Sequence, residues 1–173
     1  MPRRGVTFGR LEPAGVLLPD LLKEGLRLVI CSFTAGEKVA EAGQWYAAPG
    51  NRLWETLHRV GLTPRQLEPA EWRSLLDYGI GLVDLTKDHS GQDRGVKFEG
   101  GRELRRKIRQ YQPEMLVFNG KRAAKEYLVM PTVVFGLLPH TIGTTKLFVC
   151  PSTSAAAKSS WDPRWWDLMA KLA

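Results

Sequence analysis

Residues 26–54 read LRLVICSFTAGEKVAEAGQWYAAPGNRLW, and this stretch decides the fold. Residues 26–33 form a nearly continuous apolar run, which is typical of a parallel strand buried on both faces. A loop with the adjacent aromatic residues Trp45 and Tyr46 follows, and Asn51 is a good N-cap for the helix after it. A strand, a long loop and a helix in this order predict the first unit of an α/β sheet, where the loop after the strand usually holds a ligand.

Strand and helix patterns alternate along the rest of the chain. Apolar runs predict further strands at residues 80–85, 115–120 and 144–152. Helical spacing and capping residues predict helices at residues 18–25, 69–79, 101–112, 121–128 and 162–172, and polar or small residues predict loops at 86–101 and 153–160. The last helix is expected to bury Trp165, Leu168, Met169 and Leu172. This alternation predicts one domain over residues 1–173, a three-layer α/β/α fold with a mainly parallel central sheet.

The composition favours a polyanionic partner. Lys and Arg number 25 against 18 Asp and Glu, which gives a formal net charge of +7. The basic residues cluster in GRELRRKIRQ (101–110) and NGKRAAKEY (119–127). No apolar run approaches the length of about 20 residues that spans a bilayer. The start of the chain also lacks an apolar signal sequence, so we expect a cytoplasmic protein without membrane contact.

Cofactor and metal binding find no support in the sequence. Cys31 and Cys150 lie in apolar runs and are expected to be buried, and the three histidines are scattered, so zinc and iron–sulfur spacings are missing. Neither a Gly-x-Gly-x-x-Gly loop nor a Walker loop occurs, so a nucleotide cofactor is not expected. We therefore expect that the protein works without a cofactor or a metal.

A series of motifs follows one order along the chain. They are YAAPGNRLW (46–54), VGLTP (60–64), LLDYGIGLVDL (75–85), EGGRELRRKI (99–108), QPEMLVFNGKRAAKEY (112–127) and HTIGTTKLFVCPSTS (140–154). In order and spacing the chain resembles, from about Leu18 to Ser154, the mismatch-specific uracil-DNA glycosylases, the G:T/U mismatch branch of the uracil-DNA glycosylase superfamily. The resemblance implies a uracil-DNA glycosylase-like fold and a monofunctional DNA glycosylase that needs no cofactor or metal.

The activity implied by the resemblance is base excision. Such an enzyme flips uracil, or another damaged or mispaired base, out of DNA and hydrolyses the N-glycosidic bond, which leaves an abasic site. The implied partner is duplex DNA with a G:U mismatch, with single-stranded DNA as an open alternative. We expect a monomer, because one pocket reads one flipped base.

The resemblance also implies roles for individual residues. Phe33, Gly36, Tyr46 and Asn51 match positions that bind the base, and Tyr46 matches the aromatic residue that stacks on it. The residues implied to contact DNA are Lys121, Ser152, Ser154, Ala155, Ala156 and Lys158. Structural roles remain open for three of these residues: Tyr46 as a core residue, Asn51 as a helix cap alone, and Lys121 as a solvated charge.

Two family motifs are altered in this chain. Gly-Ile-Asn-Pro-Gly of the family is Ser-Phe-Thr-Ala-Gly at residues 32–36, so Thr34 replaces the asparagine that positions the attacking water. A threonine hydroxyl can hold a water but cannot act as a base near neutral pH. Asn-Pro-Ser-Gly-Leu-Ser is Ser-Thr-Ser-Ala-Ala-Ala at residues 152–157, which reduces the bulky wedge to Ala156. Flipping costs a few kcal/mol, so a weak wedge argues against strict dependence on a mismatch.

The catalytic group is expected to be a loop carboxylate, because charge develops on the sugar during cleavage. Asp93 ranks first, since Gly91 and Gly95 on either side let the backbone approach a ligand closely. Asp88 ranks second, and both residues could equally be exposed loop carboxylates. The other acidic candidates are Glu37 and Glu41, beside the altered motif, and Asp84, which lies inside a strand and is expected to be structural.

Two other functions remain open. The chain could be a non-catalytic protein that binds DNA or damaged bases on the same fold, and Thr34 is the residue that favours this alternative. A small-molecule enzyme on a similar α/β scaffold is the third hypothesis. Release of free uracil from a duplex with one G:U pair separates the first function from the other two.

Overall fold

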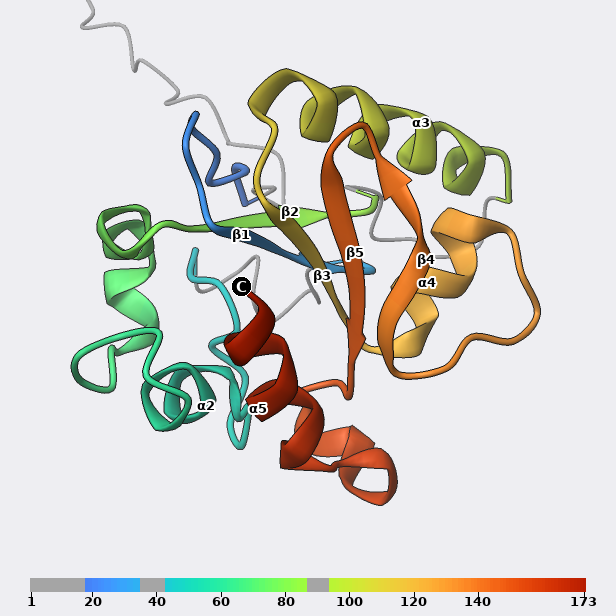
Figure 1. The fold of residues 1–173 in the computed structure, drawn as a ribbon. Helices are drawn as coiled ribbons and strands as arrows, with labels where there is room; N and C mark the ends of the chain where they lie inside the picture. Colours follow the sequence, from blue (N-terminus) through green and yellow to red (C-terminus); the bar gives the residue numbers. More distant parts are fainter. Residues whose placement is uncertain (1–17, 35–42, 87–93) are drawn as a thin grey trace, which may run out of the picture.

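The computed structural model describes residues 18–34, 43–86 and 94–173, with residues 94–100 described by their backbone alone. Its centre is a five-stranded sheet in the order β2-β1-β3-β5-β4 (Figure 1). The strands are β1 (Leu28–Ser32), β2 (Ile80–Asp84), β3 (Met115–Asn119), β4 (Gly136–Ile142) and β5 (Thr145–Cys150). β2, β1, β3 and β5 run parallel and β4 is antiparallel to β5, so the predicted mainly parallel sheet is confirmed.

Helices cover both faces of the sheet, as the three-layer prediction requires (Figure 1). They are α2 (Leu53–Arg59), α3 (Arg94–Tyr111), α4 (Lys121–Leu128) and α5 (Pro163–Leu172), with the 3-10 helices η1 (Pro69–Tyr78) and η2 (Ala155–Ser160). β1 shows how the two cores divide. Leu28 and Ile30 pack with α2 and α5 in one core, whereas Val29 and Cys31 pack with α3 and α4 in the other. All four side chains are fully buried, because successive strand residues point to opposite faces of the sheet.

The predicted helix at residues 18–25 does not form. Leu21 instead pairs with Leu82 in an antiparallel bridge, with N···O distances of 2.8 and 2.9 Å. β2 is an edge strand, and its outer backbone groups obtain hydrogen-bond partners from this extended segment. A Cβ at Gly81 would lie 2.6 Å from the carbonyl oxygen of Leu21, so this close approach requires glycine.

Three other boundaries differ from the predictions. α3 begins at Arg94, inside the predicted loop at 86–101, and Gly101 faces the Tyr127 ring of α4, 3.8 Å from an ideal Cβ position. The contact between the two helices outweighs the helix propensity of glycine, which is about 1 kcal/mol below that of alanine. The predicted helix at 69–79 is the 3-10 helix η1, and the predicted loop at 153–160 contains η2. No described helix, α3 included, is long and apolar enough to cross a membrane.

β4 is a strand that the sequence analysis does not predict. Pro139 lies within it, where the register to β5 shifts between Leu137 and Thr141. An edge strand tolerates proline, because one side of the strand makes no ladder hydrogen bonds. The apolar pattern is also weak, since Leu137 is 49% exposed while Leu138 is buried.

The buried face of α5 is rotated from the predicted one. Trp166 and Met169 are fully buried, whereas Leu168 and Leu172 are 41% and 43% exposed. The Trp166 indole fills the core, and its Nε1 donates to the carbonyl oxygen of Pro151 at 3.0 Å. The predicted cap is confirmed, because the Asp162 carboxylate accepts from the Arg164 backbone N–H at 3.0 Å.

Candidate functional site

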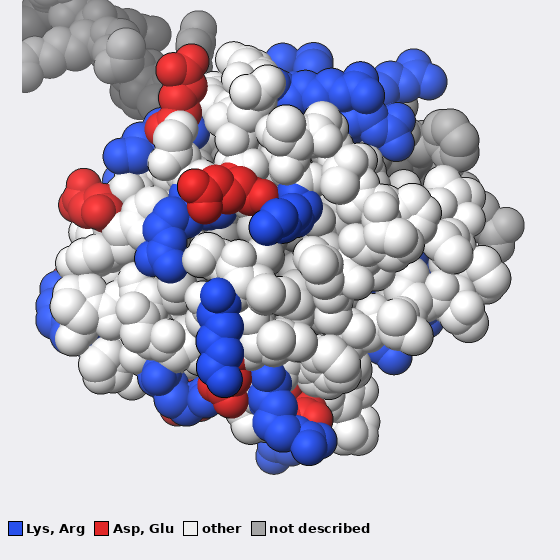
Figure 2. Space-filling model, viewed as in Figure 1, with Lys and Arg blue, Asp and Glu red and all other residues white. Residues whose placement is uncertain are grey.

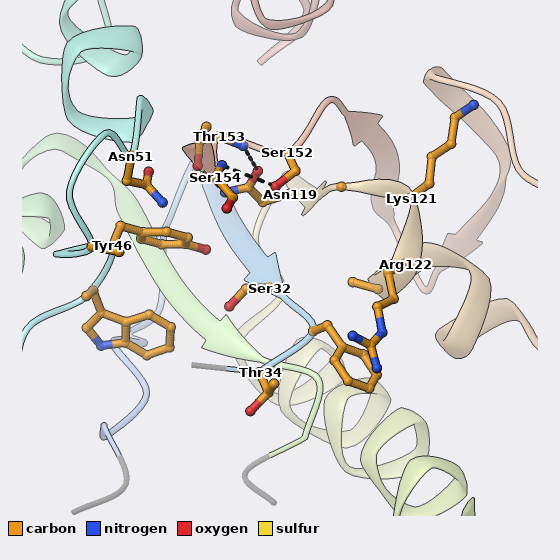
Figure 3. A pocket seen from close by; sticks show the side chains of 15 residues that line it. Ser32, Thr34, Tyr46, Asn51, Asn119, Lys121, Arg122, Ser152, Thr153 and Ser154 are labelled. Atoms are coloured by element: carbon orange, nitrogen blue, oxygen red, sulfur yellow. Dashed lines mark hydrogen bonds between the residues drawn. The ribbon is translucent and has the colours of Figure 1, made fainter. Parts of the chain in front are cut away.

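A cavity of about 430 Å³ opens where β1, β3 and β5 end (Figure 3). This carboxyl edge of a parallel sheet is where α/β folds usually bind ligands. The residues that line the cavity are Ser32, Phe33, Thr34, Trp45, Tyr46, Ala48, Asn51, Asn119, Gly120, Lys121, Arg122, Ala123, Ser152, Thr153 and Ser154. The loops after three strands therefore build one site from segments far apart in the sequence.

The structure brings together most of the predicted site residues that it describes. Phe33, Thr34, Tyr46, Asn51, Lys121, Ser152 and Ser154 line the cavity. Ala155, Ala156 and Lys158 do not line it and belong to η2, directly beyond Ser154. The predicted residues Gly36, Asp88 and Asp93 lie outside the described part of the chain, as do Glu37 and Glu41.

Tyr46 forms one wall of the cavity in an uncommon backbone conformation, with φ at 52°. The indole Nε1 of Trp54 donates to the Tyr46 carbonyl oxygen at 3.3 Å, which helps to hold this conformation. The residue is 9% exposed, and its hydroxyl has no hydrogen-bond partner among the described residues. Figure 3 shows the hydroxyl pointing toward the space between Ser32 and Asn119.

The Tyr46 hydroxyl stays protonated at any working pH. Burial raises the pKa of Tyr46 far above its usual value, and the nearby side chains of Ser32 and Asn119 offset this only in part. Trp45, beside it, is buried and donates from Nε1 to the Pro19 carbonyl oxygen at 3.2 Å. Trp45 thus packs in the core, while Tyr46 offers the cavity a neutral polar group.

Asn119 fixes the loop after β5, and the sequence analysis does not single it out. Its Nδ2 donates to the Thr153 Oγ1 at 2.9 Å, and its Oδ1 accepts from the Thr153 backbone N–H at 3.0 Å. Gly120 follows with φ at 105°, and a Cβ there would lie 3.2 Å from the Cβ of Ser152. The last residue of β3 and the loop after β5 are therefore held in close contact.

The same loop also holds the start of α2. The Arg52 backbone N–H donates to the Thr153 carbonyl oxygen at 2.8 Å, and the Arg52 Nη1 donates to the Ser154 carbonyl oxygen at 3.3 Å. The Asn51 Oδ1 accepts from the Leu53 backbone N–H at 3.0 Å. The N-cap of α2 is Arg52 and not Asn51 as predicted, so Asn51 satisfies the first N–H of the helix from one residue before the cap. The loops before α2 and after β5 form one connected rim of the cavity.

Ser32 and Asp84 form a pair at the base of the cavity. They are register partners at the ends of β1 and β2, and the Ser32 Oγ donates to the Asp84 Oδ1 at 2.6 Å. Ser32 lines the cavity, whereas Asp84 lies behind it and is 4% exposed. Asp84 lies inside β2, where a structural role is expected, and it accepts the hydrogen of a hydroxyl that lines the cavity.

The rim of the cavity carries positive charge. The Arg122 guanidinium lies 3.9 Å from the centre of the Phe33 ring, and the Lys121 ammonium lies 4.4 Å from that of Phe135. Figure 3 shows the Lys121 side chain directed away from the cavity. A second group of basic side chains gathers over α3 (Figure 2), where the four arginines Arg102, Arg105, Arg106 and Arg109 are exposed. None of the described residues that line the cavity is acidic.

The family relationship agrees with this geometry. A family model of the uracil DNA glycosylase superfamily matches residues 19–169, which include every element of the sheet and every described residue that lines the cavity. Members of this superfamily are DNA glycosylases that act on DNA. The chain therefore belongs to the uracil-DNA glycosylase superfamily.

Proposed function

We propose that the protein is a monomeric, monofunctional DNA glycosylase of the mismatch-specific type, which excises uracil from DNA. The observation that supports this most directly is the cavity at the carboxyl edge of the sheet, with Tyr46 as an aromatic wall and polar side chains at its base. A volume of about 430 Å³ is sufficient for a flipped base and part of its sugar. The basic rim favours the DNA backbone beside the flipped nucleotide.

In this proposal each part of the site has one task in the hydrolysis. The flipped base stacks on Tyr46, and the hydroxyl of Thr34 holds the attacking water at the opening of the cavity. The bond between the base and the sugar breaks as positive charge develops on the sugar, and a carboxylate stabilises this charge. We propose that Asp93 supplies the carboxylate. The products are the free base and an abasic site.

The residues after β5 are small, and they favour a substrate base that is weakly paired and therefore easy to flip. Ala155 packs against Gly50, where an added Cβ would lie 3.0 Å from the Ala155 Cβ, and Ala156 is exposed. An alanine fills little of the gap that a flipped base leaves in the duplex. We therefore propose that a G:U mismatch and single-stranded uracil are both better substrates than a U:A pair.

The test of this function is release of free uracil from a labelled duplex with one G:U pair, under single-turnover conditions. An otherwise identical G:C duplex serves as the control and should release no base. Binding of the G:U duplex without release of uracil would instead identify a DNA-binding protein that has lost the activity.

The substitution Tyr46→Ala should slow uracil release by about 10- to 100-fold, because stacking contributes roughly 1–3 kcal/mol per base. Rates from the single-turnover assay measure this effect at saturating enzyme. The control is Tyr78→Ala, which removes a partly buried tyrosine that packs against the core outside the cavity. Loss of stability in both variants with an unchanged rate in Tyr46→Ala would show that Tyr46 is a core residue alone.

DNA binding should weaken steeply with salt, by about 10²-fold between 50 and 200 mM for three to four phosphate contacts. Fluorescence anisotropy with a labelled duplex measures the slope of log K against log salt. Lys121→Ala should reduce this slope by about 0.9, whereas Lys171→Ala, at the end of α5, should leave it unchanged. Affinity that is flat over this salt range would argue against DNA as the partner.

A further inference from the structure

The outward face of α3 carries a row of arginines that the proposed excision of uracil does not use. Arg102, Arg105 and Arg109 follow one another at intervals of three and four residues, so they project from one side of the helix over about 10 Å of its length. All three are exposed, and none of them lines the cavity. Figure 2 shows basic side chains gathered over α3. These three residues are called the arginine row.

The arginine row differs from the basic side chains beside it, which have acidic partners. Arg106 pairs with Glu103 at 2.6 Å on the surface of the helix. Lys107 pairs with Asp20, and both of these side chains are 17% exposed. The arginine row forms no salt bridge within the described part of the chain. Three like charges on one face repel one another, so a polyanion bound across them is favoured.

Arg105 is held in place before any partner binds. Its Nε donates to the Tyr127 hydroxyl of α4 at 3.2 Å, and its guanidinium lies 5.4 Å from the centre of the Tyr127 ring. Tyr127 is buried, so it anchors the arginine to the core. The contact leaves both Nη groups of Arg105 to donate to one phosphate. Because the side chain is already ordered, binding costs less conformational entropy.

The arginine row runs away from the cavity. α3 connects the carboxyl end of β2 with the amino end of β3, so it runs opposite to these parallel strands. Arg102 is eight residues beyond the first residue of α3, which is about 12 Å along the helix, and Arg109 lies in the last turn. The cavity lies at the carboxyl ends of the strands. DNA with a base in the cavity therefore lies at the opposite edge of the sheet from Arg109.

We propose that the arginine row is a second DNA-binding site, which holds the phosphate backbone of another DNA segment while the cavity examines the first. A DNA strand carries one phosphate per about 3.4 Å of duplex axis, so the length of the row corresponds to about three phosphates. The inference rests on DNA as the partner and not on cleavage of a base. It gives a role to the basic cluster at residues 101–110, which the proposed excision leaves without one.

The structure favours DNA over a membrane surface or an acidic protein as the partner of the row. A helix that lies on a membrane presents an apolar face to the lipid, whereas Leu104 and Ile108 of α3 are buried in the core. No large apolar side chain is exposed in the part of α3 whose side chains are described. Protein interfaces are usually centred on aromatic or apolar anchors, which the row lacks. Members of the superfamily act on DNA.

Sedimentation velocity tests the inference by counting the duplexes that one protein molecule holds. The probe is a duplex of about 12 base pairs with one 2′-fluoro-2′-deoxyuridine opposite guanine, which resists cleavage because the fluorine disfavours positive charge on the sugar. At about 50 mM salt and excess DNA, we expect one wild-type molecule to hold two duplexes. The second duplex should bind with a dissociation constant of roughly 10⁻⁴–10⁻⁶ M, the range of sequence-independent binding.

Two triple variants with the same change in net charge separate the row from the charge of the whole protein. The arginine-row variant combines Arg102→Gln, Arg105→Gln and Arg109→Gln. The control variant replaces three exposed arginines outside α3 and combines Arg59→Gln, Arg65→Gln and Arg73→Gln. The arginine-row variant should bind the second duplex at least about tenfold more weakly and the first within about twofold of the wild type. The control variant should hold both duplexes, and circular dichroism checks both folds.

Every outcome decides for or against the row. Saturation of the wild type at one duplex, or equal loss of the second duplex in both triple variants, would overturn the inference. Tighter binding of phosphatidylserine vesicles or of polyglutamate than of DNA, through the same arginines, would overturn it as well. If the arginine-row variant fails to fold, Arg102→Gln and Arg109→Gln decide singly, because each should lower the salt slope of the second binding step by about 0.9.

Release of uracil measures the proposed function separately. The arginine-row variant should retain the wild-type rate in the single-turnover assay at saturating enzyme, because the row does not line the cavity. A second duplex that depends on the row, in a protein that releases no uracil, would support the inference and refute the glycosylase function. Release of uracil by a protein that holds only one duplex would do the reverse.

Discussion

Asp93→Asn should slow the release of uracil from a G:U duplex by about 10²–10⁴-fold, the range typical for loss of a charged group that assists bond cleavage. The sugar becomes positively charged as the bond to the base breaks, and a carboxylate beside it stabilises that charge. Asparagine has nearly the same shape as aspartate but no charge. DNA binding should survive, because a negative charge near a polyanion hinders binding if it has any effect.

The described lining of the cavity supplies no carboxylate of its own, so the proposed catalytic carboxylate has to come from another segment. None of the described cavity-lining residues is acidic, and the one buried carboxylate close by, Asp84, accepts the hydrogen of Ser32. β1 and β2 end at this edge and continue in the chain into residues 35–42 and 87–93, which contain Glu37, Glu41, Asp88 and Asp93. Asp93 is flanked by Gly91 and Gly95, and it directly precedes the first residue of α3.

Single-turnover rates at saturating enzyme measure the effect of Asp93→Asn, with Asp88→Asn and Glu41→Gln as matched controls. Both controls should retain more activity than Asp93→Asn, and Thr34→Ala should have a smaller effect than any loss of the catalytic carboxylate. Full activity in Asp93→Asn together with loss in one of the controls would move the role to that residue. Full activity in all of them would mean that a positioned water and the phosphates of the DNA suffice.

The parallel part of the fold could be predicted from the sequence because burial on both faces leaves a simple pattern. Residues 26–33 are almost entirely apolar, and β1 lies at residues 28–32 within them. β4 carries no such pattern, since an edge strand with one exposed face mixes apolar and polar residues and tolerates Pro139. The buried face of α5 was predicted wrongly, because the sequence alone does not show which of the adjacent residues Trp165 and Trp166 enters the core. The hydrogen bond from the Trp166 indole to the Pro151 carbonyl oxygen favours Trp166, and this bond depends on the tertiary fold.

Some residues of the site could be predicted from a single stretch of sequence, whereas others depend on which strands are neighbours in the sheet. Tyr46, Thr34 and Asn51 lie in one loop whose composition marks it, so the sequence and the resemblance were enough to name them as candidates. The pairing of Ser32 with Asp84 depends on the register between two strands. The sequence does show that Ser32 and Asp84 are each a polar residue at the end of an apolar strand. This pattern predicts their contact only when β1 and β2 are known to be neighbours.

Asn119→Leu should lower the free energy of unfolding by about 2–4 kcal/mol. Leucine branches at Cγ as asparagine does and is somewhat larger, so the change removes two hydrogen bonds without leaving a hole. Each bond contributes about 1 kcal/mol, and the fully buried Thr153 would keep a backbone N–H without a partner, which costs a further 1–3 kcal/mol. Equilibrium denaturation in urea, with the midpoint and slope compared to the wild type, measures the loss.

Thr153→Val separates the two bonds, because it removes the hydroxyl that Asn119 donates to and keeps the backbone N–H that donates to Asn119. It should cost about 1 kcal/mol. The rate of uracil release should fall further in Asn119→Leu than in Thr153→Val, because only Asn119→Leu removes the bond that holds the Thr153 backbone. The Thr153 carbonyl oxygen also accepts from the Arg52 backbone N–H at 2.8 Å, so a shift of Thr153 would disturb a second loop of the cavity as well. Wild-type stability and activity in Asn119→Leu would show that these loops hold their positions without the Asn119 side chain. The cavity would then depend on the close contact of Gly120 with Ser152 and on the backbone bond of Arg52.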